Sequence, residues 1–157
     1  MSDESFYQYD LAVLGQSIDA LRSMLPPSEL YYSVKANAHP DIIRRCVQRG
    51  LSIEVSSIGE LDAAITAGAV AEDIVCTGPG KSDQYLLRAL ELGSCISVES
   101  AQEIDRLNLL HTAHPSRVLV RINASKQTTK ARLQMTGVAS QFGIDEDQAP
   151  EAIQADV

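Results

Sequence analysis

The segment Tyr31-Tyr32-Ser33-Val34-Lys35-Ala36-Asn37 is a short aromatic and β-branched run that ends in a lysine and an asparagine. This composition predicts a strand followed by a loop that reaches His39-Pro40. Because side chains alternate between the two faces of a strand, Lys35 is expected on the same face as Tyr31 and Ser33. A lysine in this place is either a solvated surface group or an amine nucleophile that awaits a carbonyl carbon. The segment alone leaves both interpretations open.

Four further segments have the composition of strands, and helical patterns lie between them. The five strands begin near residues 31, 52, 74, 96 and 118, a repeat of roughly 21–22 residues. Parallel neighbours need crossover connections, so this alternation predicts an α/β fold with a parallel sheet. No Gly-x-Gly-x-x-Gly follows the first strand, and the dinucleotide-binding version of a doubly wound sheet therefore loses its main sign. The regular spacing favours a TIM (β/α)8 barrel.

A complete barrel usually takes about 200 residues or more. The 157 residues supply about five βα units. Residues 1–157 are therefore predicted to form a partial barrel, an incomplete domain with two open strand edges. The sequence predicts helices over residues 11–25, 40–49, 58–67 and 82–92 and from residue 101, with caps at Asp10, Ser57 and Ser100. Residues 125–140 show no clear period, and residues 145–157 are expected to be helical.

The composition excludes several classes of partner. A net charge of −8 and a pI near 4.8 argue against nucleic acid, which needs a basic face. No apolar run approaches the roughly 20 residues that cross a bilayer, and the amino terminus does not resemble a secretion signal. The three histidines lack the spacing of a metal site. The cysteines are expected to be reduced core thiols of a cytoplasmic protein: Cys46, Cys76 and Cys95.

Catalytic groups of a TIM barrel lie at the carboxyl ends of its strands. Here those positions are polar or charged: Lys35 and Asn37, Glu54, Thr77 to Lys81, Glu99, Arg121 and Asn123. Glu54 is predicted to pair with Lys35 and to hold an ammonium or a protonated imine in place, with a purely structural ion pair as the alternative. Arg121 is predicted to balance Glu54 across the mouth. Thr77 to Lys81 lacks the Walker spacing, so a glycine turn is favoured over a phosphate loop.

Several segments resemble, in order and spacing, the fold-type III pyridoxal-phosphate-dependent decarboxylases. This family includes the diaminopimelate, ornithine, lysine and arginine decarboxylases of the alanine-racemase-like barrel. The similar segments are residues 5–10, 32–37, 50–61, 77–81, 97–100, 120–123 and 141–143. Two positions depart from the family pattern, since Glu54 stands where aspartate is usual and Gln141 where lysine is usual.

The resemblance implies that Lys35 forms a Schiff base with pyridoxal 5'-phosphate, and that Glu54, Asn37 and Arg121 help to bind this cofactor. It implies decarboxylation of an amino acid of the diaminopimelate, ornithine or lysine class. Residues 135–143 resemble branches that use a carrier-protein-bound amino acid instead. A homodimer is expected for the full-length protein.

The family also uses cofactor groups that are expected after Val157, including a C-terminal β-domain. The chain alone is therefore expected to bind the cofactor poorly and to be inactive. Two alternatives remain open. One is an alanine-racemase-type barrel, which the Glu-Leu and Gln-Phe-Gly segments disfavour. The other is a non-catalytic half-barrel that assembles with a partner or buffers the cofactor.

Overall fold

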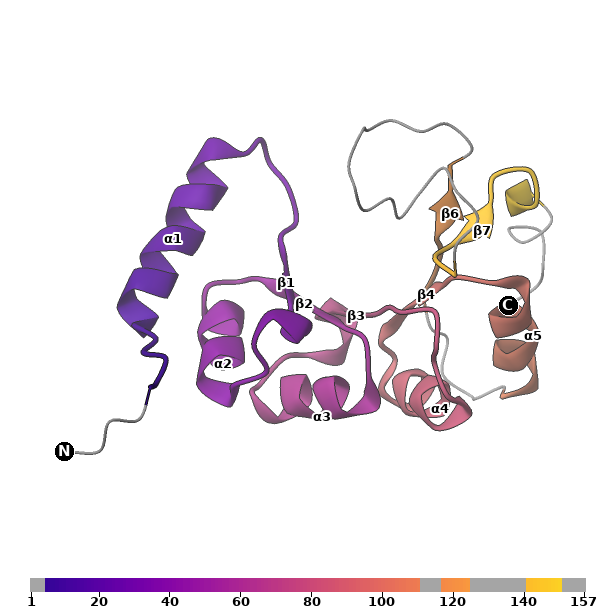
Figure 1. Ribbon diagram of the computed structural model, residues 1–157, viewed down its shortest axis with the longest axis horizontal. Helices are drawn as coiled ribbons and strands as arrows, with labels where there is room; N and C mark the ends of the chain where they lie inside the picture. Colours follow the sequence, from indigo (N-terminus) through magenta and orange to yellow (C-terminus); the bar gives the residue numbers. More distant parts are fainter. Residues whose placement is uncertain (1–4, 111–116, 125–140, 151–157) are drawn as a thin grey trace.

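The computed structural model describes residues 5–110, 117–124 and 141–150. The main strands are β1 (Tyr31–Ser33), β2 (Ser52–Val55), β3 (Ile74–Cys76), β4 (Cys95–Val98) and β5 (Val118–Val120). They form one parallel sheet in the order β1-β2-β3-β4-β5 (Figure 1). Neighbours in space are thus neighbours in sequence, as in the wall of a βα barrel, because each crossover carries the chain to the next parallel strand. The predicted α/β class and strand order are confirmed.

Each strand is separated from the next by a helix. The helices are α1 (Leu11–Met24), α2 (Pro40–Gln48), α3 (Ile58–Thr66), α4 (Asp83–Leu92) and α5 (Ala101–Leu109), with short 3-10 turns η1 (Val34–Ala36) and η2 (Ala71–Asp73). In Figure 1, α2, α3 and α4 lie side by side along one face of the sheet. The predicted caps are confirmed, since Asp10, Ser57 and Ser100 each accept a hydrogen bond from a backbone N–H of the first helical turn.

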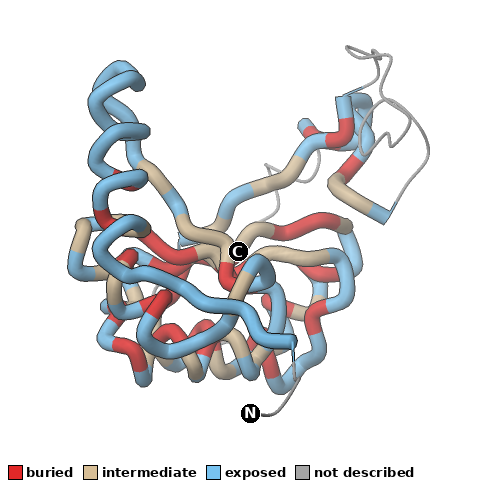
Figure 2. The backbone as a smooth tube through the Cα atoms, turned by 60° about the vertical axis from the view of Figure 1, so that its left-hand side comes forward, coloured by how far each residue is buried: buried red, intermediate tan, exposed pale blue. Residues whose placement is uncertain are grey.

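The core lies between the sheet and these helices. Strand side chains that face the helices are at most 1% exposed: Ile53, Val55, Ile74, Cys76, Ile96 and Val98. The alternate positions face the other way, and Ser33, Glu54 and Ser97 among them are only partly buried. Buried positions thus concentrate in the strands and in the helices packed on them (Figure 2). Polar side chains are left on the opposite face, where a barrel has its interior.

All three cysteines are free, buried thiols, as predicted. Burial raises the pKa of the Cys46 and Cys76 thiols to about 11. These two side chains therefore stay protonated and serve as small apolar residues of the core.

Helix α1 packs on α2 through arginine side chains as well as through apolar residues. Gly15 is buried, and a Cβ there would lie 2.9 Å from the guanidinium nitrogens of both Arg45 and Arg49. Arg45 also donates to the carbonyl oxygen of Leu11 at 3.0 Å. Of the apolar positions expected along this helix, Ile18 is buried and Leu14 packs partly buried against the core, whereas Leu11, Leu21 and Leu25 are exposed. The amphipathic spacing predicted the helix, but it did not predict that arginines of α2 and its C-terminal end would pack against Gly15.

The fifth strand is shorter than predicted. β5 ends at Val120, and β6 (Ile122–Asn123) pairs in parallel with β7 (Ile144–Asp145). Gly143 enables this pairing with a φ of 86°, and an added Cβ would lie 3.0 Å from the carbonyl oxygen of Arg121. The helix expected from residue 145 is wrong at its start, because Asp145 is in β7. The aperiodic stretch 125–140 and the end of the chain lie outside the described residues.

Among the described helices, none has the length and hydropathy needed to cross a bilayer.

Candidate functional site

Lys35 lies on a turn and not, as predicted, on the strand itself. β1 ends at Ser33, and Lys35 is the middle residue of η1, between the fully buried Val34 and Ala36. The Tyr32 hydroxyl donates to the carbonyl oxygen of Asn37 at 2.9 Å and closes the segment over the turn. The Lys35 side chain is 66% exposed at the carboxyl end of the sheet. The buried Val34 thus anchors a turn from which the Lys35 side chain extends towards solvent.

The predicted ion pair between Lys35 and Glu54 is present, with 3.7 Å between the ammonium nitrogen and Oε2. Glu54 stands in register with Ser33 of the neighbouring strand, which places its side chain on the polar face of the sheet. The Thr77 hydroxyl donates to the other carboxylate oxygen, Oε1. The carboxylate is therefore held between β1 and β3, with one oxygen directed towards the amine.

The surroundings of Glu54 favour its charged form. Burial by itself raises the pKa of this carboxyl, but the hydroxyls of Ser33 and Thr77 and the charge of Lys35 lower it by more, so the net pKa lies below the ordinary value of 4.5. Ser33 lies close to the carboxylate, although its oxygen makes no hydrogen bond of good geometry. Glu54 is thus an anion at neutral pH.

A second ion pair lies further along the same end of the sheet. Arg121 donates through Nη1 to Oε2 of the buried Glu99 at 3.0 Å, and the backbone N–H of Gly78 donates to Oε1 at 2.8 Å. The guanidinium also lies over the ring of Phe142, 4.9 Å from its centroid. The prediction that Arg121 balances Glu54 is wrong, because its carboxylate partner is Glu99.

A third pair, between Lys81 and Glu103, was missed by sequence reasoning. The ammonium nitrogen lies 3.0 Å from Oε2, and the two side chains are 1% and 3% exposed. Lys81 also donates to the carbonyl oxygen of Gly78 at 2.6 Å, while Oε2 of Glu103 accepts from the backbone N–H of Glu99 at 2.9 Å. The capping box at Ser100 did mark Glu103. No local sequence pattern predicted that Lys81, from the glycine turn, would pair with Glu103.

The turn interpretation of Thr77 to Lys81 agrees with the structure, since the lysine that a phosphate loop would offer to a ligand is buried in an ion pair. Asn37 uses its side chain locally, because Oδ1 accepts from the backbone N–H of His39 at 2.9 Å. Its role towards a cofactor stays a prediction. Asn123 is buried and donates to Asp145 at 3.1 Å.

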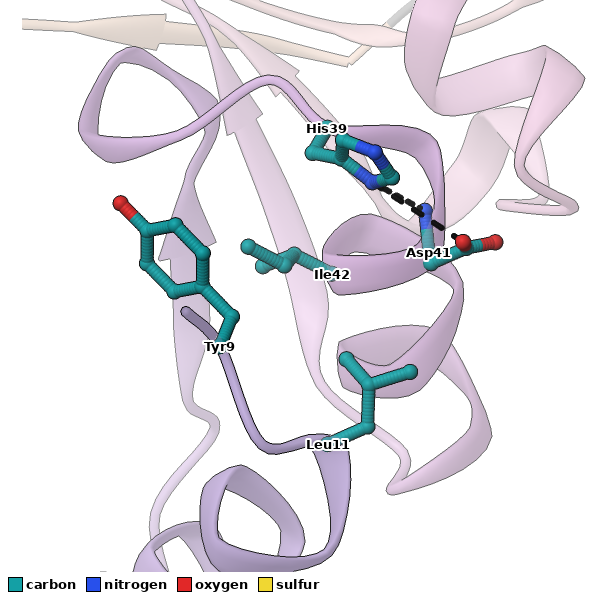
Figure 3. Close-up of a pocket in the computed structure, with 5 residues that line it drawn as sticks. All are labelled: Tyr9, Leu11, His39, Asp41 and Ile42. Atoms are coloured by element: carbon teal, nitrogen blue, oxygen red, sulfur yellow. Dashed lines mark hydrogen bonds and ion pairs between the residues drawn. The ribbon is translucent and has the colours of Figure 1, made fainter. Parts of the chain in front are cut away.

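A pocket of about 220 Å³ adjoins the Asn37 turn, since His39 is part of its lining (Figure 3). It is lined by Tyr9, Leu11, His39, Asp41 and Ile42, which come from the start of α1 and the start of α2. The ring nitrogen Nδ1 of His39 accepts from the backbone N–H of Asp41 at 3.3 Å and caps α2. This nitrogen of the pocket lining is therefore used in capping the helix. Within the part of the chain that the structure describes, no cluster of three or more potential metal ligands occurs.

The arrangement is an exposed amine held by a carboxylate at the carboxyl end of a parallel, barrel-like sheet. Residues 11–156 match the family model described as pyridoxal-dependent decarboxylase, pyridoxal binding domain. The chain belongs to this family.

Relatives of this pyridoxal binding domain act on several amino-acid substrates. The chain is 38% identical over 145 residues to an L-glutamyl-[BtrI acyl-carrier protein] decarboxylase of Niallia circulans, covering 90% of this chain and 34% of the relative. It is 33% identical over 145 residues to a diaminopimelate decarboxylase of Deinococcus radiodurans, covering 92% and 37%. The structure of diaminopimelate decarboxylase from Helicobacter pylori complexed with L-lysine has a TM-score of 0.85 at 27% identity, covering 96% and 40%. The chain thus spans well under half the length of these relatives, and its similarity to them supports the barrel assignment.

Proposed function

We propose that this chain is the pyridoxal-phosphate-binding part of an amino-acid decarboxylase, and that Lys35 is the amine to which the cofactor attaches. The observation that carries the proposal is the contrast between two lysines. The Lys35 ammonium is exposed and 3.7 Å from one carboxylate, whereas the Lys81 ammonium is buried and occupied by Glu103. An aldehyde that approaches this end of the sheet therefore meets the amine of Lys35.

The residues around Lys35 fit such a group. Glu54 supplies a negative charge 3.7 Å from the Lys35 nitrogen and orients the side chain. Arg121 is held by Glu99 and stacked over Phe142, and its remaining N–H groups can donate to an anionic part of the cofactor or substrate. Asn37 follows Lys35 by two residues and is proposed to border the cofactor.

Pyridoxal phosphate, when bound, supplies a ring that accepts the electron pair left when an amino acid loses its carboxylate as CO2. The protein's part is to orient the groups around that ring. Lys35 would hold the cofactor through its side-chain nitrogen. In its ammonium form, beside Glu54, Lys35 could also supply a proton at the carbon that loses the carboxylate.

The substrate is proposed to be an α-amino acid, either free or attached to a carrier protein. The relatives divide on this point, because one acts on a glutamyl group on an acyl-carrier protein and others on diaminopimelate. CO2 release from the full-length protein, measured with free diaminopimelate, ornithine and lysine and with a carrier-bound amino acid, distinguishes the two classes.

The proposal for Lys35 is tested by fixing the cofactor with borohydride. The chain is incubated with pyridoxal phosphate, reduced with sodium borohydride and digested, and the modified lysine is located by peptide mass spectrometry. We expect modification at Lys35, a visible absorbance band before reduction, and loss of both in Lys35→Arg. Arginine keeps the charge beside Glu54 but is not a nucleophile at neutral pH, so the variant is a matched control.

The buried Lys81 serves as an internal reference, since its amine is 1% exposed. Equal modification of all lysines, or a band that persists in Lys35→Arg, would show that the reaction is unspecific and would overturn the assignment.

We also propose a cytoplasmic location and a homodimer for the full-length protein. The first is supported by three cysteines that are buried free thiols, a state typical of reducing compartments. The second rests on the family resemblance, and sedimentation of the full-length protein tests it.

A further inference from the structure

Two consecutive residues after β3 each donate to a carboxylate from a different neighbouring strand. The Thr77 hydroxyl donates to Oε1 of Glu54, which belongs to β2. The Gly78 backbone N–H donates to Oε1 of Glu99, which follows β4, at 2.8 Å. Because β3 lies between β2 and β4 in the sheet, this short turn is the physical link between the pair at Lys35 and the pair at Arg121.

The turn has the backbone needed for both bonds. Gly78 has a φ of 98°, a conformation that side chains other than glycine rarely adopt. This conformation directs the N–H of Gly78 towards Glu99, while the Thr77 side chain stays on the Glu54 side. The backbone N–H of Thr77 donates to the carbonyl oxygen of Val55 at 2.8 Å and continues the pairing of β2 with β3. Thr77 is thus positioned by its own main chain.

The buried ion pair of Lys81 and Glu103 also holds this turn in place. Lys81 donates to the carbonyl oxygen of Gly78, and its partner Glu103 accepts from the backbone N–H of Glu99. One buried ion pair therefore holds the loops that follow β3 and β4. Burial makes these contacts rigid, because a charge there can leave its partner only at a high desolvation cost.

We propose that Thr77 is a positioning residue for Lys35 that acts through Glu54. This inference deepens the proposed function and rests on it, since it assigns to the turn the task of keeping one carboxylate oxygen against the reactive amine. Lys35 cannot hold Glu54 in place itself, because its side chain is long and mostly exposed. Ser33 lies close enough to help lower the pKa of Glu54, but its hydroxyl makes no hydrogen bond of good geometry to the carboxylate. Thr77 contributes the fixed donor.

The groups that face Glu54 come from three directions. Lys35 and Ser33 approach from η1 and β1, and Thr77 approaches from the end of β3. From α4, the buried Tyr85 hydroxyl donates to the carbonyl oxygen of Val55 at 3.0 Å. Burial is the main cause that raises the pKa of Tyr85, and the charge of Glu54 adds a small part. The Thr77 hydroxyl lies 3.3 Å from the same carbonyl oxygen. It has one proton, and a carboxylate is the stronger acceptor for it.

The test compares three variants at this position. Thr77→Val removes the hydroxyl and keeps the shape, Thr77→Ser keeps the hydroxyl, and Thr77→Ala removes the hydroxyl without adding a methyl group. Thr77→Ala replaces Thr77→Val if the latter does not fold, as judged by circular dichroism. The first readout needs no cofactor: the titration of the Glu54 carboxyl followed by carbon-13 NMR, with the signal assigned by its loss in Glu54→Gln. The second is borohydride-fixed pyridoxal phosphate at Lys35 at neutral pH.

We expect the Glu54 titration to move to higher pH in Thr77→Val, because the charged form loses a donor, and to stay near wild type in Thr77→Ser. Fixation at Lys35 is expected to fall about tenfold in Thr77→Val, the scale of one hydrogen bond to a charged group, and less than about threefold in Thr77→Ser. A Thr77→Val chain that titrates like wild type overturns the inference. If the titration moves but wild type itself is never fixed at Lys35, the positioning of Glu54 stands and the proposed function fails.

Discussion

At the scale of single residues, the site is built from carboxylates whose lone pairs are occupied. Glu54, Glu99 and Glu103 each accept from a hydroxyl or backbone donor and each pair with a cation. A buried carboxylate without such partners would be expelled or protonated. The three differ in the exposure of their cations. Lys35 is the only one of the three cations that is mostly open to solvent. The ion pair of Lys35 with Glu54 is therefore the one that can open to admit another group.

The lowered pKa of Glu54 predicts a pH-dependent contribution to stability. A folded-state pKa below the unfolded value means that the contribution is complete above the ordinary pKa of 4.5 and disappears as the pH falls through the folded value. Glu54→Gln is therefore expected to lower the free energy of unfolding by about 1 kcal/mol at neutral pH. The difference from wild type should shrink as the pH falls below 4.5. Urea denaturation at a series of pH values measures this.

Asp62→Asn provides the control, because Asp62 pairs with Arg88 on the exposed surface at 3.3 Å. Such a pair contributes roughly 0.5 kcal/mol or less. A Glu54→Gln difference that is constant from neutral to acidic pH would contradict the prediction.

At the scale of elements, loops after two strands are fastened by one buried ion pair. The capping box of α5 directs Glu103 back to the N–H of Glu99, and Lys81 reaches the same carboxylate from the turn before α4. The equivalent glutamate of α3, Glu60, accepts from the backbone N–H of Ser56 at 2.8 Å but has no lysine partner among the described residues. Lys81 therefore adds a buried ion pair to the loops after β3 and β4 that the loop after β2 does not have among the described residues.

Removing one partner of the Lys81–Glu103 pair is expected to lower the free energy of unfolding more than replacing both partners with uncharged residues. Lys81→Met leaves Glu103 buried without its cation and should lower the free energy of unfolding by about 3–5 kcal/mol. Lys81→Met combined with Glu103→Gln removes both charges, while the amide oxygen can still accept from Glu99, and should recover most of that loss. Urea denaturation gives both values.

Arg88→Met, which breaks the exposed pair with Asp62, is the matched control and should cost less than about 1 kcal/mol. If Lys81→Met were as mild as Arg88→Met, the buried pair would not be what fixes these loops.

At the scale of the whole molecule, the chain presents unpaired edges and uncovered apolar side chains. Within the described residues, β1 pairs only with β2 and β5 only with β4. Phe6, Tyr7, Met24 and Leu109 are 75% exposed or more. Exposed edges and apolar patches are where further strands, helices or a second copy attach. The relatives are more than twice as long as the aligned chain.

We expect the 157-residue chain to be fixed by borohydride at Lys35 only at high cofactor concentration and to release no measurable CO2 from diaminopimelate, ornithine or lysine. The physical reason is that about five βα units leave one side of the cofactor uncovered, so substrate orientation and exclusion of water are incomplete. Radiometric CO2 release measures the activity, with the Lys35→Arg chain as the blank. CO2 release that disappears in Lys35→Arg would contradict this expectation. Size-exclusion chromatography over a range of concentrations would show assembly with a second copy.

The sequence by itself determined the order of the elements and the main pair of the site. Strand composition, helix caps and the regular spacing are local properties, so the parallel sheet, the caps at Ser57 and Ser100 and the pairing of Lys35 with Glu54 could all be predicted. Burial of the cysteines followed from their apolar neighbours.

Tertiary structure alone decided how the other long side chains pair. Arg121 binds Glu99 and not Glu54, Lys81 turns inward to Glu103, and Arg45 and Arg49 pack against Gly15 of α1. These outcomes depend on the register of neighbouring strands and on the direction in which each turn releases its side chains. No period in a single segment encodes such a direction, because the partners come from segments more than 20 residues apart.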